Sequence, residues 1–116
     1  MTELFRVKAV GPVQVIRLAL PESLDSDEFD RLNESLLTIL AERPGGGWVL
    51  DLSELHYAGS SLLGLMVNLR QRVKQAGGRL VLFGLSDRLM TIFRTCSLER
   101  LFVIRKAEDD AINRAT

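Results

Sequence analysis

The stretch that decides the fold spans residues 48–64 and reads WVLDLSELHYAGSSLLG. It opens with a short apolar run around Val49 and Leu50, which is typical of a buried central strand. Ser60 and Ser61 come later in the stretch, and apolar residues then recur at helical spacing: Leu62, Leu65, Met66, Leu69, Val73 and Ala76. The stretch therefore predicts a strand, a tight connection and an amphipathic helix that begins at two serines.

The two serines have two interpretations. Serine is a preferred N-cap because its hydroxyl accepts a backbone N–H of the first helical turn, so helix capping alone explains Ser60 and Ser61. The alternative is that a hydroxyl at this place carries a function. The stretch by itself leaves both interpretations open, and the rest of the chain is needed to weigh them.

Composition limits the class of protein. A chain of 116 residues is expected to form one domain, residues 1–116. Its 15 basic and 15 acidic side chains cancel, which gives no general attraction to nucleic acid or to an anionic membrane. No apolar run approaches the length of a membrane span, and the first residues do not begin a signal peptide. We expect a soluble, cytoplasmic protein that neither binds nucleic acid nor inserts into a membrane.

The chain before this stretch predicts a hairpin and a helix. Residues 4–10 and 13–20 each alternate in polarity around a Gly-Pro pair, which indicates two antiparallel strands. Asp25 is a candidate N-cap, and Glu28 stands at the position that completes a capping box. An amphipathic helix is therefore expected to begin after Asp25.

The chain after this stretch predicts four further elements. They are a strand at residues 79–84, a helix from Ser86 to about residue 95, a strand at 101–104 and a helix at 108–115. The complete order is β-β-α-β-α-β-α-β-α, and strands that are joined by single helices pair in parallel. The expected fold class is α/β, with a mixed β-sheet opened by an antiparallel hairpin and helices packed on it.

The case for an enzyme is weak. A serine hydrolase needs the pattern Gly-x-Ser-x-Gly, but Leu63 stands where the last glycine after Gly59 should be. The chain has one histidine, His56, and no cluster of residues at metal-ligand spacing. Asp25 and Asp51 would form an acid–base pair only if the fold brought them together. We expect no catalytic activity, no cofactor and no metal.

Cys96 is the single cysteine, which excludes an internal disulfide. It lies in helical register with Leu89, Ile92 and Phe93, so the pattern predicts a small core residue rather than a nucleophile.

The combined order of these features resembles a STAS domain, the family of bacterial anti-sigma factor antagonists. The resemblance covers nearly the whole chain. It rests on the opening hairpin, the loop ending in Leu24-Asp25, the strand VLDLS at residues 49–53, the helix start GSSLLG at 59–64, Gly77-Gly78 before a strand, and the apolar residues Leu89, Ile92, Phe93 and 101–104.

The resemblance implies a switch. Members of this family bind an anti-sigma factor that is also a serine kinase, and this binding frees the sigma factor. Phosphorylation of the antagonist ends the binding, and a PP2C-type phosphatase restores it. The family motif is usually Asp-Ser-Ser-Gly-Leu-Gly with the second serine phosphorylated, which corresponds here to Ser61. Gly59 stands where the family has aspartate, and Leu62 stands where it has the first glycine.

These inferences define a candidate site. We expect Ser61 to be the phosphorylated residue and the partner to contact Asp25, Gly59, Ser60, Ser61, Leu62, Leu63, Val67 and Asn68. Two other classes of function stay open. One is a STAS scaffold in a stress-signalling or transporter-associated complex, and the other is a module that senses a small ligand or a nucleotide.

Overall fold

The computed structural model describes residues 4–21 and 23–116, so the first residues, which bear on the absence of a signal peptide, lie mostly outside it. The elements follow the predicted order: β1 (Phe5–Val10), β2 (Val13–Leu18), α1 (Ser26–Ala41), β3 (Gly47–Asp51), α2 (Ser60–Gln75), β4 (Arg79–Phe83), α3 (Asp87–Thr95), β5 (Val103–Arg105) and α4 (Glu108–Ala115). The α/β class and the opening hairpin are confirmed.

The five strands form one mixed sheet in the order β1-β2-β3-β4-β5. β1 and β2 pair antiparallel, and each later pairing is parallel. β3 therefore lies at the centre of the sheet, as its apolar run predicts. Because β2, β3 and β4 run in the same direction, the loops that follow them all leave from the same edge of the sheet.

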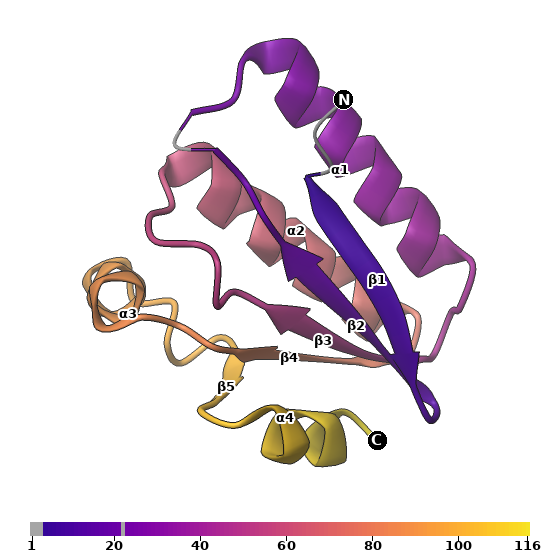
Figure 1. Ribbon diagram of the computed structural model, residues 1–116. Helices are drawn as coiled ribbons and strands as arrows, with labels where there is room; N and C mark the ends of the chain where they lie inside the picture. The colour runs from indigo at the N-terminus through magenta and orange to yellow at the C-terminus, as the bar shows by residue number, and fades with distance from the viewer. Residues whose placement is uncertain (1–3, 22) are drawn as a thin grey trace.

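Alternation along the strands divides the core into two layers. Trp48 and Leu50 of β3 belong to the larger core cluster, which also holds the buried leucines of α1 and α2. Val49 points to the other face, where it packs in a cluster with Ala111 and Ala115 of α4. Figure 1 shows α1 and α2 on one side of the sheet and α4 on the other.

The end of α3 corrects the prediction for Cys96. The helix ends at Thr95, and Cys96 is an exposed C-cap rather than a core residue. Ser97 takes a left-handed conformation with φ of 59°, and the Leu98 N–H donates to the Phe93 carbonyl oxygen at 2.8 Å. This reversal turns Leu98 toward the core. The helix ends one residue before Cys96, so the helical register that predicted a buried Cys96 does not extend to it.

The last strand begins later than its apolar run predicts. The Leu101 N–H donates to the Leu98 carbonyl oxygen at 3.0 Å, so Leu101 and Phe102 belong to a turn that precedes β5. The ring of Phe102 packs against that of Phe93, with the ring centroids 5.8 Å apart. The start of the apolar run at residues 101–104 is therefore explained by core packing rather than by strand pairing.

Candidate functional site

Two helix starts follow the shared edge of the sheet, and the first belongs to α1. The Glu28 N–H donates to Asp25 Oδ1 at 2.8 Å, and the Asp25 N–H donates to Glu28 Oε1 at 3.2 Å. These reciprocal bonds confirm the predicted capping box. The hydrogen bond from the Glu28 backbone also holds the pKa of Asp25 below its ordinary value, because it favours the charged carboxylate.

The second helix start, that of α2, is built differently. Its N-cap is Gly59, with φ −83° and ψ 179°, and no side chain caps it. Ser60 and Ser61 are the first two helical residues, so the prediction that they cap the helix is wrong by one position for Ser60 and two for Ser61. A hydroxyl inside the first turn lies past the N-cap position from which it would accept the free N–H groups.

Both serines are exposed, and Ser61 lies in the first turn of α2 as predicted. No acidic side chain stands in this first turn, whereas the first turns of α1, α3 and α4 each hold at least one. The positive end of the α2 dipole is therefore left without a negative side chain of its own helix.

The residues around the serines differ in what they offer a partner. Leu62, Val67 and Asn68 are half-buried and keep part of their side chains at the surface. Leu63 is only 7% exposed and packs in the core, so it supports the surface from beneath. Gly64 is exposed, and a Cβ added there would meet no atom within 4 Å.

An aromatic side chain extends this surface. Tyr57 is 52% exposed, and the guanidinium carbon of Arg88 lies 5.5 Å from the centre of its ring. Arg88 comes from α3, so sequence spacing gave no signal for this contact. A Cβ on Gly59 would lie 3.7 Å from the Tyr57 ring, which places the stacked pair beside the start of α2.

The two aspartates considered as an acid–base pair have separate partners. Asp51 is 1% exposed, and its carboxylate accepts hydrogen bonds at 2.9 Å from Arg17 Nε and from the Ser53 N–H. The bond to Asp51 raises the pKa of Arg17. Asp25 caps α1 instead. Asp51 therefore anchors the loop that leads toward α2, and Asp25 orders the loop after β2.

Metal ligands and membrane-spanning helices are two further features to consider in residues 4–21 and 23–116. No group of three or more histidine, cysteine, aspartate or glutamate side chains there could hold a metal ion. Among the same residues, no helix is both long and apolar enough to cross a membrane.

These features define a class of protein: a small mixed α/β domain whose candidate site is an open surface at a helix start. The chain belongs to the STAS-domain family, because residues 8–105 match the family model described as "Mlab, STAS domain". The resemblance inferred from the residues is thereby confirmed.

Comparison with known proteins adds two relatives by sequence and two by structure. The chain is 38% identical over 61 residues to anti-sigma-B factor antagonists of Listeria monocytogenes and Listeria innocua, and the match spans 53% of this chain and about half (54%) of each relative. A STAS-domain protein from Planctomyces limnophilus, described as an anti-sigma-factor antagonist, has a TM-score of 0.83 at 19% identity and covers 96% of this chain and 97% of its own.

The second structural relative is the anti-sigma factor antagonist SpoIIAA, solved in two forms. The unphosphorylated form has a TM-score of 0.72 at 22% identity, over 95% of this chain and 94% of its own. The phosphorylated form, from Bacillus, has a TM-score of 0.67 at 22% identity, over 97% and 99%. At these identities the structural likeness establishes the fold alone.

Proposed function

We propose that this protein is an anti-sigma factor antagonist whose partner is an anti-sigma factor that is also a serine kinase. The observation that carries the proposal is the open start of α2, where two exposed serines follow a glycine N-cap and no acidic side chain occupies the first turn. The names of the Listeria relatives and of SpoIIAA support this assignment.

Ser61 is the proposed phosphate acceptor. The family places the modification on the second serine, and SpoIIAA has been solved in a phosphorylated form. The first turn of a helix favours a phosphate, because its N–H groups lack partners within the helix and the dipole is positive there. The domain supplies an acceptor hydroxyl and performs no catalysis, the partner transfers phosphate from ATP, and a PP2C-type phosphatase removes it.

The partner surface surrounds this serine. It comprises Asp25, Gly59, Ser60, Ser61, Leu62, Val67 and Asn68, with Leu63 buried below them. Phosphorylation adds about −1.5 to −2 charges at neutral pH. In an interface with apolar contacts at Leu62 and Val67, that charge must lose its water or meet partner carboxylates. Either cost amounts to roughly several kcal/mol, which weakens binding by orders of magnitude.

Calorimetry with the anti-sigma factor kinase of the same genome tests the surface. Val67→Glu is expected to weaken binding at least about tenfold, because it places a charge in the contact. Val7→Glu is the matched control, since Val7 is 38% exposed on β1, away from the proposed surface. Ser61→Ala is expected to bind, and Ser61→Asp to bind poorly. Equal binding by Val67→Glu and Val7→Glu would place the partner elsewhere.

A second candidate function follows from the two departures from the family motif. Gly59 replaces the usual aspartate, and Leu62 replaces a glycine beside the acceptor. A member that kept the fold and lost the switch would serve as a STAS scaffold. In that case Ser61→Asp would bind the partner as well as the unmodified protein does.

A further inference from the structure

A cavity of about 300 Å³ opens beside the first residues of β4, on the side where β5 pairs. The register of β5 against β4 begins at Val81, so Arg79 and Leu80 extend beyond the shorter strand. The cavity lies at this uncovered edge of β4, where Arg70 and Lys74 of α2 line it from one face of the sheet and Arg114 of α4 lines it from the other. β5, with only three residues, does not cover this part of β4.

Four cationic side chains line this cavity, and no carboxylate does: Arg70, Lys74, Arg79 and Arg114. Some cations elsewhere in the described residues pair with acids, as in Lys8 with Glu108 and Arg105 with Asp110. Within residues 4–21 and 23–116, none of the four cavity cations forms an ion pair. A chain of zero net charge has thus gathered four uncompensated positive charges around one hollow.

One of the four is held in place by the backbone. Arg70 Nε donates a hydrogen bond of 2.8 Å to the Leu101 carbonyl oxygen. A guanidinium has further N–H groups beyond Nε, and these remain to bind an acceptor. Apolar residues also line the cavity, Leu80, Val81 and Val103 among them.

Charge and size together select a ligand. Like charges in one concavity repel, and an anion offsets that repulsion while the concave wall concentrates the field. A volume of about 300 Å³ lies at the small end of ligand pockets, and it is too small to enclose a segment of polypeptide. The geometry points to a binding site for a small organic polyanion, with phosphate or carboxylate groups on the cations and an apolar body against the apolar lining residues.

This site is separate from the proposed partner surface. Ser60 begins α2, and Lys74 lies 14 residues further along the same helix, which corresponds to about 21 Å at 1.5 Å per residue. Anion binding in this cavity therefore does not depend on phosphorylation of Ser61.

The test is a titration with inorganic pyrophosphate and with citrate, followed by the NMR shifts of the backbone amides of Leu80, Leu101 and Val103. We expect saturable shifts, and the tighter of the two probes identifies phosphate or carboxylate as the preferred group. The variant Arg79→Gln with Arg114→Gln is expected to bind at least about tenfold more weakly, because it removes two of the four cations. Both side chains are exposed, so the fold is expected to remain intact.

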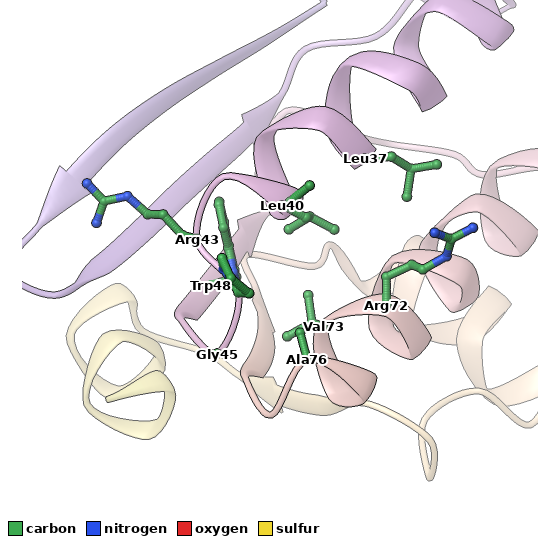
Figure 2. Close-up of a pocket in the computed structure, with 10 residues that line it drawn as sticks. Leu37, Leu40, Arg43, Gly45, Trp48, Arg72, Val73 and Ala76 are labelled. Carbon is green, nitrogen blue, oxygen red and sulfur yellow. The ribbon is translucent and has the colours of Figure 1, made fainter.

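The control is Arg43→Gln with Arg72→Gln, which removes the same charge from a different place. These two arginines line a separate cavity of about 160 Å³ between the ends of α1 and α2, and Figure 2 shows them on opposite sides of it. Affinity in this control is expected to change less than about twofold. Equal losses in both double variants, or shifts that do not saturate, would overturn the proposal. So would binding of a ten-residue glutamate peptide at the same amides without binding of either small anion.

Discussion

The helix starts of α1 and α2 follow neighbouring parallel strands, yet their N-termini are capped differently. α1 begins with Asp25 and Glu28 bonded to each other's backbone N–H groups. α2 begins with Gly59, which offers no side chain, and leaves Ser60 and Ser61 exposed. One start is closed by its own side chains, and the other is open to solvent.

The difference separates stability from function along one edge of the sheet. A closed start stabilises its helix because the first N–H groups are satisfied within the chain. An open start gives up that gain and leaves free N–H groups, a positive dipole end and two hydroxyls for something outside the chain. The proposed switch uses the second arrangement, and the following changes break or sharpen the contrast.

The largest expected effect is the loss of the closed start. Asp25→Ala removes the capping side chain of α1 and should lower the free energy of unfolding by about 1 kcal/mol. Ser60→Ala should change it by less than about 0.5 kcal/mol, because Ser60 caps nothing. Chemical denaturation of both variants measures the contrast, and equal losses would mean that the two starts do not differ. Asp25→Ala is therefore a poor probe of partner binding, for which Asp25→Asn, which keeps a capping oxygen, is the better choice.

The closed start should also respond to pH. The pKa of Asp25 is lowered in the folded state, so the charged carboxylate stabilises the fold. This stabilisation is complete above the unfolded pKa of about 3.9, and it is lost as the pH falls through the folded pKa. The difference in unfolding free energy between wild type and Asp25→Asn should be constant between pH 5 and 7 and shrink below about pH 4. A difference that persists in stronger acid would show that the charge of Asp25 does not act on α1.

A smaller effect is expected at the open start, in Gly64→Ala. Alanine is a better helix residue than glycine, and its Cβ would meet no atom of the chain within 4 Å. The free energy of unfolding should rise by about 0.5–1 kcal/mol. Calorimetry should then show weaker partner binding, because the methyl group lies one turn from the serines on an exposed face. Higher stability with unchanged affinity would show that the partner surface does not extend to Gly64.

The smallest effect is expected when the open start is closed. Gly59→Asp places a carboxylate at the N-cap of α2, where the nearest obstacle is the Tyr57 ring at 3.7 Å from the new Cβ, an ordinary contact. Stability should rise by a few tenths of a kcal/mol, as is usual when aspartate replaces an N-cap glycine. Thermal unfolding measures this, and a clear loss of stability would mean that the loop cannot hold a side chain there.

Local signals predicted much of this molecule. The hairpin, the capping box at Asp25, the helix that Ser86 opens and the helix over residues 108–115 all follow from residue types at short spacing. The predictions that were wrong concerned the boundaries of elements: the N-cap of α2, the residue after α3 and the start of β5. Serine is preferred at the N-cap, but Gly59 takes that place in α2. The end of α3 near residue 95 was predicted, but the helical register was extended one residue further to Cys96, which is the C-cap and is followed by the left-handed Ser97.

Contacts between distant elements could not be predicted from one sequence. Arg88 reaches Tyr57 from α3, and the cationic cavity gathers side chains from α2, β4 and α4. In the sequence these cations are scattered among 15 acidic residues and appear balanced. The fold brings them to one hollow at the edge of β4 that the three-residue β5 leaves uncovered.

The most direct test of the switch is incubation with the anti-sigma factor kinase and Mg-ATP, followed by peptide mapping of residues 59–64. The account predicts one phosphate, on Ser61, that is absent in Ser61→Ala and retained in Ser60→Ala, together with loss of kinase binding by the phosphorylated protein. Phosphate on Ser60 would move the acceptor by one position. No phosphate on either serine, with kinase binding intact, would contradict the switch.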